Sequence, residues 1–134
     1  MKKAVETPHA PSAIGPYSQA VESGGWIFCS GQIGIDPATG VLVAGGIEAE
    51  TRRVLANLRF VLAAAGLKFE HVLKTTIFLV DLADFDAVNQ IYDQHVAAPY
   101  PARATVQVAA LPRHARIEID AIAVRPAPSA SRRA

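Results

Sequence analysis

Hydrophobic residues recur every three or four positions over residues 47–65, and this spacing predicts one face of an amphipathic helix. Val54 and Leu62 lie on that face. Polar residues, among them Arg52 and Asn57, fall on the opposite side and are expected to face solvent. The segment is therefore predicted to be a helix that buries one stripe of side chains.

A second helix is predicted over residues 84–96. Val88 and Tyr92 share one stripe at helical spacing. Asp81 or Asp84 is a candidate N-cap, and Pro99 follows where the helix must already have ended. This helix is shorter than the first and is expected to cover a smaller part of the core.

Three further segments carry the pattern of β-strands. Residues 72–80 (VLKTTIFLV) are β-branched and almost continuously apolar, which is typical of a central strand. Two shorter strands are predicted at about 16–22 and 25–30, joined by a glycine-containing turn. Residues 1–15 are rich in Pro, Ala and Ser and are expected to be irregular or to lie at a sheet edge.

The last third of the chain is predicted to form a hairpin. Strand 103–110 would turn at the LPRHA motif and return as strand 116–124. Strand alternation then places Glu118 opposite Gln107, on the face that also carries Arg103. In this register Arg103 and Glu118 would line one cavity.

The order of elements, β-β-α-β-α-β-β, predicts an α+β fold with both helices on one face of a mixed sheet. We expect a single domain over residues 1–125 and a disordered C-terminal tail over 126–134, because the tail has no apolar periodicity. At 134 residues the chain fits one domain.

The opposite face of this sheet is also apolar. Phe78, Val106 and Ile122 are expected on it, and no third layer of structure is available to cover them. A large exposed apolar surface marks an interaction site. The sequence therefore predicts association between copies of this chain.

Composition excludes several classes of function. The formal net charge is +1, so no general attraction to nucleic acid or to an acidic membrane is expected. Cys29 is the single cysteine, which rules out a disulfide framework, and the four histidines lack metal-ligand spacing. We therefore expect no metal and no cofactor. The N-terminus lacks a signal-peptide h-region and no apolar run is long enough to span a membrane, which indicates a cytoplasmic protein.

Two charged residues stand out in otherwise apolar strands. Arg103 is either a charge that protects an edge strand or a fork that binds a carboxylate in two places. Glu118 is either a solvent-facing residue, an ion-pair partner of Arg103 or Arg116, or an acid/base group. The pattern of residues alone leaves these alternatives open.

Other candidates are weaker when each is taken alone. Tyr17 follows a Gly-Pro bend and is either a held pocket ring or an ordinary core or interface aromatic. Ser30 and Gly31 end a strand, where a hydroxyl and an open backbone N–H could face a ligand, or where the chain simply turns. Asn89 is either a ligand contact or an exposed helix position, and Cys29 is expected to be a small core residue.

Several motifs together resemble the Rid family of reactive intermediate deaminases, also called YjgF-like proteins. They are, in order, IGPYSQAV, FCSGQIGIDPATG, VLANLRFVLAAAG, VLKTTIFLVDLADFDAVNQIY, PYPARATVQVAALP and IEIDAIA. The resemblance covers about residues 8–125. It implies a homotrimer of chorismate-mutase-like α+β subunits with clefts between them.

The resemblance also implies an activity, the hydrolysis of enamine and imine acids such as 2-aminoacrylate to 2-keto acids and ammonia. The family's carboxylate-binding arginine falls on Arg103 and its water-activating glutamate on Glu118. The pocket residues of the family fall on the following positions: Tyr17, Ser30, Gly31, Asn89 and Thr105. Many members carry cysteine where Thr105 stands, but the family role there belongs mainly to a backbone carbonyl, so threonine should be tolerated.

Other functions remain possible at this stage. The cleft could bind small acids such as 2-keto acids and regulate without turnover, or it could deaminate a larger enamine acid such as 3-aminoacrylate or 2-aminomuconate. Ribonuclease activity, attributed to some relatives, is disfavoured by the near-zero charge and by the absence of an aromatic RNA-binding platform or a histidine pair.

Overall fold

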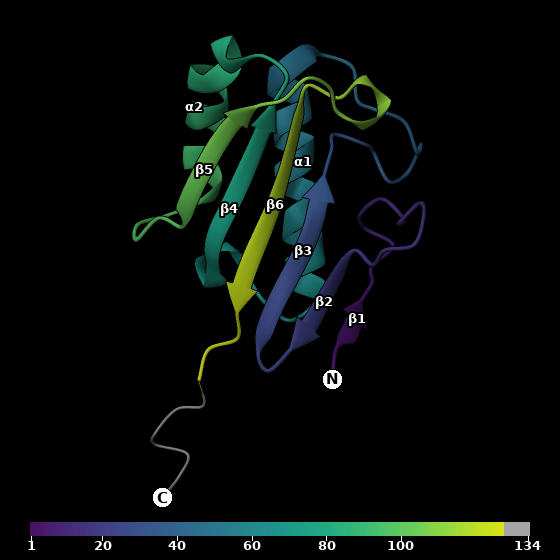
Figure 1. Ribbon diagram of the computed structural model, residues 1–134, viewed down its shortest axis with the longest axis vertical. Coiled ribbons are helices and arrows are strands. Elements are labelled where there is room, and N and C mark those ends of the chain that lie inside the picture. Colours follow the sequence, from purple (N-terminus) through teal and green to yellow (C-terminus); the bar gives the residue numbers. More distant parts are fainter. Residues whose placement is uncertain (128–134) are drawn as a thin grey trace, which may run out of the picture.

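The computed structural model describes residues 1–127. Its sheet contains the strands β1 (Lys3–Val5), β2 (Ala20–Ser23), β3 (Trp26–Gln32), β4 (Val72–Leu79), β5 (Ala102–Gln107) and β6 (Ile117–Val124). The two helices are α1 (Gly46–Ala64) and α2 (Phe85–His95). Both lie behind the sheet in the view of Figure 1, so the expected α+β fold with helices on one face is confirmed.

The element bounds follow the sequence pattern closely at the helices and the central strands. The first predicted strand was placed too early, because residues 16–19 form no strand and β2 begins only at Ala20. Gln19 explains this difference, since its buried side chain binds the backbone of the N-terminal loop, including the carbonyls of Ala10 and Pro11. The loop is thereby fixed by a side chain instead of a strand ladder.

The sheet order is β1-β2-β3-β6-β4-β5, and this corrects the expected C-terminal hairpin. β5 pairs parallel with β4, whereas β6 pairs antiparallel with both β3 and β4. β4 therefore separates the two strands that were expected to be neighbours. The register also changes, because Phe78 of β4 lies opposite both Glu118 and Val106.

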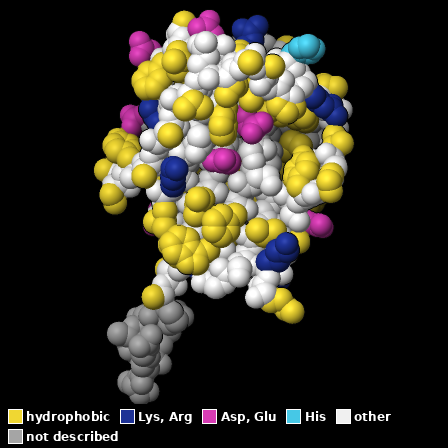
Figure 2. Space-filling view, in the orientation of Figure 1, with side chains coloured by type: hydrophobic (Ala, Val, Ile, Leu, Met, Phe, Trp, Pro, Cys, Tyr) yellow, Lys and Arg dark blue, Asp and Glu magenta, His cyan; other side chains and the backbone are white. Residues whose placement is uncertain are grey.

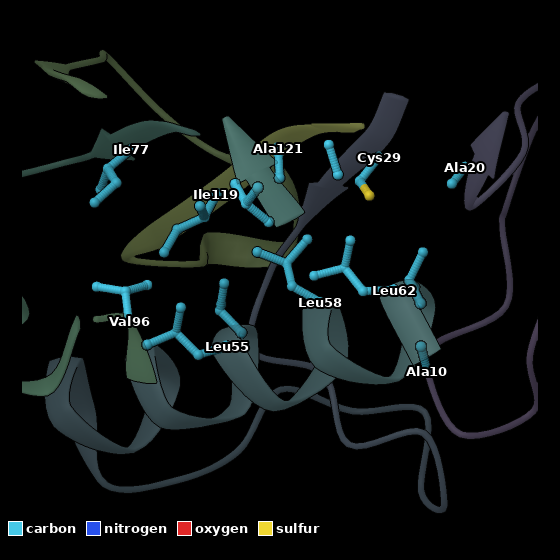
Figure 3. Close-up of a cluster of buried hydrophobic side chains, with 14 of the residues drawn as sticks. Ala10, Ala20, Cys29, Leu55, Leu58, Leu62, Ile77, Val96, Ile119 and Ala121 are labelled. Carbon is cyan, nitrogen blue, oxygen red and sulfur yellow. The ribbon is translucent and has the colours of Figure 1, made fainter. Parts of the chain in front are cut away.

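The hydrophobic core lies between α1, α2 and the helix-facing side of the sheet (Figure 3). From α1 it takes Leu55, Leu58 and Leu62, which are fully buried. The facing strands add Ile77 and Ile119, also fully buried. A core of this kind supplies about 25 cal/mol for each Å² of apolar surface removed from water.

Three polar residues of α1 are buried, namely Glu50, Thr51 and Asn57, and Asn57 among them was expected on the solvent side. Asn57 is fully buried, and its side-chain amide donates to the carbonyls of Ile33 and Ile35. Glu50 is buried as well, and its carboxylate accepts the backbone N–H of Arg116. The polar side of α1 therefore fixes the loops beside the sheet, since burying these groups requires partners.

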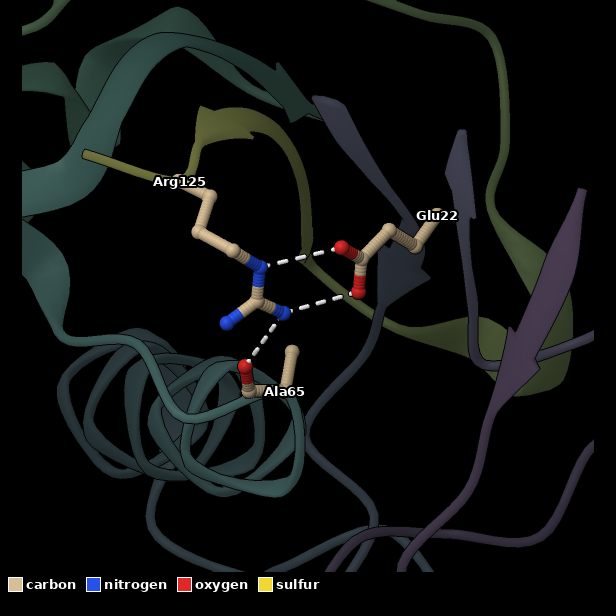
Figure 4. Close-up of polar contacts among 3 residues, drawn as sticks. All are labelled: Glu22, Ala65 and Arg125. Atoms are coloured by element: carbon tan, nitrogen blue, oxygen red, sulfur yellow. Dashed lines mark hydrogen bonds and ion pairs between the residues drawn. The ribbon is translucent and has the colours of Figure 1, made fainter. Parts of the chain in front are cut away.

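An ion pair closes the end of the sheet where β6 finishes. The guanidinium of Arg125 donates to both carboxylate oxygens of Glu22 on β2 and to the carbonyl of Ala65 after α1 (Figure 4). The guanidinium lowers the pKa of the Glu22 carboxyl. This contact joins the sheet to the C-terminal end of α1.

The face of the sheet away from the helices is open and largely apolar, as predicted. Exposed fractions are 45% for Trp26, 47% for Phe28 and 41% for Val106, large values for such side chains. Figure 2 shows this face, where hydrophobic side chains gather over the sheet and acidic side chains lie among them. Phe78 and Ile122 are only partly buried on the same face.

The described chain forms one layer of sheet and one layer of helices as far as Val124. Pro126 and Ala127 are exposed and belong to no element. The rest of the predicted tail, residues 128–134, lies outside the described residues. Within the described part, neither helix is long and apolar enough to cross a bilayer.

Candidate active site

Arg103 is held on the helix-facing side of β5, at the free edge of the sheet. Its guanidinium carbon lies 5.1 Å from the ring centroid of Tyr92 and 5.5 Å from that of Phe85, both on α2. Cation–π contacts of this kind restrain a guanidinium without neutralising its charge. Tyr92 is itself fixed, because its hydroxyl lies 2.8 Å from Oγ1 of Thr75.

Arg103 opens into a cavity of about 530 Å³ that Asn89, Tyr92 and Tyr100 also line. Among residues 1–127, no carboxylate lies within 4.0 Å of the Arg103 guanidinium. A guanidinium of this kind has N–H donors free for a planar anion. Asn89 lines the same cavity and can add an amide donor. Two of the residues expected to bind a ligand, Arg103 and Asn89, therefore do lie together.

Thr105 lies two residues further along β5, on the same face as Arg103. Its Oγ1 is buried and has no hydrogen-bond partner among the described residues. Buried hydroxyls normally have a partner, and leaving one without costs about 1–3 kcal/mol. Within the described chain the Thr105 hydroxyl is therefore a buried polar group without a partner.

Glu118 lies on the open face of β6 and lines a different cavity, of about 340 Å³. Tyr17, Gly31 and Arg113 line the same cavity. No hydrogen bond from the described residues reaches the Glu118 carboxyl. Its pKa is raised, first because burial disfavours the charged form and second because the charge of Asp120 repels it.

The position of the Glu118 carboxyl requires a residue without a side chain at position 31. A Cβ atom built on Gly31 would lie 2.7 Å from Cδ of the Glu118 carboxyl, closer than real Cβ contacts allow. The absence of a side chain at Gly31 thus leaves the carboxyl its room in the cavity. Any larger residue here would displace Glu118 or close the cavity.

Tyr17 and Ser30 differ in how freely their hydroxyls face this cavity. The Tyr17 ring lines it and is 53% exposed, and its hydroxyl accepts the backbone N–H of Ile14 at 3.3 Å. The Ser30 hydroxyl instead donates to the carbonyl of Ser18 at 2.6 Å. Ser30 therefore fixes the chain before Gly31, and its O–H donor is already used.

The expected residues fall into two half-sites. The half-site on β5 and α2 holds Arg103 and Asn89, and the half-site on β3 and β6 holds Gly31 and Glu118 together with the Tyr17 ring. Thr105 lies on the same face of β5 as Arg103 but does not line its cavity. Arg103 projects from the helix-facing side of the sheet and Glu118 from the open side. The expectation that both line one cavity is therefore wrong within a single chain, because β4 intervenes and the hairpin does not exist.

Sequence reasoning missed three residues that shape the half-sites. Phe85 and Tyr92 hold Arg103 from α2, and a β4-α2-β5 crossover would have indicated this, since a helix between parallel strands packs over them. Arg113 lines the Glu118 cavity from a turn whose shape no simple motif predicts.

Cys29 is buried as expected, and its burial raises its thiol pKa to about 12.

The fold is that of a small α+β protein with two polar half-sites, one at the β5 edge of the sheet and one on the interior strands β3 and β6. Residues 7–125 match the family model described as Endoribonuclease L-PSP. The chain belongs to this family, which is the Rid or YjgF family that its motifs resemble.

Similar proteins cover nearly the whole chain. Protein DfrA of Myxococcus xanthus is 55% identical, covering 92% of this chain and 95% of that protein. The 2-iminobutanoate/2-iminopropanoate deaminase of Mus musculus is 51% identical over 93% of each chain. A crystal structure of a putative endoribonuclease from Thermotoga maritima is 51% identical, covering 95% of this chain and 100% of that one, with a TM-score of 0.92.

Proposed function

We propose that this protein is a hydrolytic deaminase of reactive 2-imino and enamine acids, working without metal or cofactor. The observation that carries the proposal is the Arg103 guanidinium, restrained over two rings and unpaired within residues 1–127. A held but unpaired cation suits the carboxylate of a small acid. A relative that is 51% identical is named as a deaminase of such imines, which supports this choice of substrate.

The two half-sites would meet between copies of the chain. β5 is an edge strand, and the open apolar face needs a cover that the described chain does not provide. A heterologous contact, in which the β5 edge of one protomer reaches the Glu118 cavity of the next, closes into a ring. The homotrimer implied by the family resemblance is such a ring, with Arg103 and Glu118 supplied by neighbouring chains.

Binding of the substrate would begin at the β5 half-site. The carboxylate of the imino acid pairs with the Arg103 guanidinium, and Asn89 can donate a further hydrogen bond. These contacts fix C2 of the substrate in one orientation, which removes part of the entropic barrier to reaction.

Chemistry would follow at the Glu118 half-site. An enamine first tautomerises to the imine, whose C2 is electrophilic. The Glu118 carboxylate accepts a proton from water as the water oxygen bonds to C2, and the same carboxyl then returns a proton to the nitrogen. The carbinolamine so formed passes its hydroxyl proton to the nitrogen through the Glu118 carboxylate as the C2–N bond breaks. Ammonia and the 2-keto acid are released, and one water is consumed for each imine. Such acid/base assistance is worth about 10²–10⁴-fold.

The raised pKa of Glu118 suits this double role. Its desolvated carboxyl gains a proton more readily than an exposed one and can therefore return it to the departing amine. Binding of small acids without turnover needs Arg103 but gives no role to this carboxyl. The catalytic reading is therefore favoured over the binding one.

The proposal is tested by generating 2-aminoacrylate in situ and following pyruvate formation with and without the protein. The wild-type chain should accelerate hydrolysis above the spontaneous rate. The Arg103→Ala variant should lose about a hundredfold or more of kcat/KM, since a charge-assisted pair to the carboxylate is removed.

The matched control is Arg52→Ala, which removes an exposed arginine of α1 bonded only to Gln94. It should leave the rate unchanged. Equal rates for the wild type and Arg103→Ala would overturn the proposed mechanism. Calorimetric binding of 2-oxobutanoate without any acceleration would instead support a binding protein.

A further inference from the structure

The turn that leads into β6 contains two adjacent residues in the left-handed region. Arg113 has φ 57° and His114 has φ 59°, and neither is glycine. Such conformations cost of order 1 kcal/mol each and persist where the surrounding structure holds them. Pro112 and the bond from the Ala115 N–H to the Pro112 carbonyl fix the turn on either side. The direction of the Arg113 side chain is thus set by the backbone.

From this turn Arg113 lines the Glu118 cavity. Its Nη1 donates to the carbonyl of Gly40 at 3.2 Å, which anchors one edge of the guanidinium. A guanidinium carries five N–H donors, so most remain free. No carboxylate among the described residues, Glu118 included, lies within 4.0 Å of it.

The Glu118 cavity has one positive and one negative side chain among its described lining residues. Arg113 is the only cation among its described lining residues, and Glu118 is the only carboxyl. The proposed mechanism uses Glu118 for water and gives Arg113 no task. The remaining lining is mostly apolar, including Ile14, Ile33 and Pro112. A guanidinium anchored at the rim of an apolar cavity suits a second anionic group of a ligand.

We propose that Arg113 is a specificity residue that binds a distal acid group, so that dicarboxylic 2-imino acids are preferred substrates. This inference rests on the proposed function, in which the carboxylate next to C2 binds Arg103. The side chain of the substrate then extends along the Glu118 cavity and ends at Arg113. The four-carbon 2-iminosuccinate and the five-carbon 2-iminoglutarate are the simplest members of this class.

The test compares two substrates that differ only in the distal acid. An amino-acid oxidase generates 2-iminosuccinate from aspartate or 2-iminopropanoate from alanine, and the decay of each imine is followed by trapping. Arg113→Gln should lower kcat/KM for 2-iminosuccinate by about tenfold or more, because one charge-assisted contact is lost. The rate on 2-iminopropanoate should stay within about twofold of wild type.

Two variants separate recognition from structure. Arg113→Lys keeps the charge but loses the planar fork, so it should restore part of the 2-iminosuccinate rate. Arg52→Gln makes the same change in net charge on exposed α1 and should alter neither rate. Equal losses on both substrates in Arg113→Gln would mean that Arg113 only supports the turn, and the inference would be wrong.

A binding measurement keeps this test separate from the proposed function. Oxaloacetate and 2-oxobutanoate are titrated into wild type and Arg113→Gln by calorimetry. Weaker binding of oxaloacetate alone supports Arg113 as the residue that binds the distal acid, even if no imine is hydrolysed, and unchanged binding of both acids contradicts that role. Failure of the wild type to accelerate hydrolysis of either imine would overturn the proposed function instead.

Discussion

Arg103 and Glu118 show how two charged side chains can be held in strands without partners of their own. Arg103 lies over the rings of Phe85 and Tyr92, which restrain its position while its charge stays available. Glu118 keeps its room in the cavity because Gly31 has no side chain. Uncharged neighbours thus restrain Arg103 and leave the Glu118 carboxyl its room.

Glu118 should make stability depend on pH in a defined direction. Its folded-state pKa is raised, so the folded chain favours the protonated carboxyl. The associated stability is present below the usual glutamate pKa and is lost as the pH rises through the folded value. Relative to wild type, Glu118→Gln should therefore unfold at a similar temperature near about pH 4 and at a higher temperature near about pH 7.5.

Thermal unfolding of both proteins at the two pH values measures this difference. Glu6→Gln, which removes an exposed carboxyl of the N-terminal segment, serves as the control for the loss of one charge. A difference between Glu118→Gln and wild type that is the same at both pH values would contradict the account of this carboxyl.

Much of the candidate site could be predicted from the sequence at the level of single residues. Strand alternation correctly grouped Arg103 with Thr105 on one face of β5, because side chains alternate whatever the neighbouring strand is. It could not show that the Ser30 hydroxyl binds the Ser18 carbonyl, since that contact depends on a loop. It also could not find Arg113, whose left-handed backbone has no glycine to indicate it.

The secondary-structure elements were predictable where periodicity is strong. Both helices and the central strand appear nearly where their patterns place them. The pairing of the last two strands was not predicted correctly, because consecutive strands were assumed to be neighbours in the sheet. The segment between β5 and β6 spans residues 108–116, long enough to cross one strand, so β6 lies on the far side of β4. Neighbouring strands are only about 4.8 Å apart.

Asn57 joins α1 to the loop that precedes the helix, and its substitution tests the strength of this contact. Its buried amide donates to the carbonyls of Ile33 and Ile35 in the segment before α1. Removing the amide would leave the Ile35 carbonyl without its donor, whereas the Ile33 carbonyl would keep the backbone N–H of Ile35. Asn57→Ala should lower the free energy of unfolding by about 2–4 kcal/mol, from lost hydrogen bonds and a small cavity. Denaturant unfolding at one fixed protein concentration measures this loss.

The comparison for Asn57→Ala is Arg52→Ala on the exposed side of the same helix. That change should stay within about 0.5 kcal/mol of wild type, as is usual for surface positions. If the two variants were equally stable, the buried amide of Asn57 would not hold the loop, and the role given to it here would be wrong.

Considered as a whole, the molecule has two surfaces that association with another copy of the chain would cover. One is the open apolar face of the sheet, with Trp26, Phe28 and Val106 exposed. The other comprises the two half-sites of the proposed active site, with Arg103 at the β5 edge and Glu118 on β6 beside β3. Association of copies would complete both at once, which is the physical reason to treat assembly and activity together. The sequence indicated the apolar face but could not show that the site is divided.

The most direct test of this account mixes two inactive variants. Arg103→Ala and Glu118→Gln should each be inactive alone. If Arg103 and Glu118 of one site come from neighbouring chains, co-expressed mixed assemblies at equal ratio should regain about a quarter of wild-type activity, since each interface receives both intact residues with that probability. Mixed assemblies that remain as inactive as either variant alone would contradict the shared site.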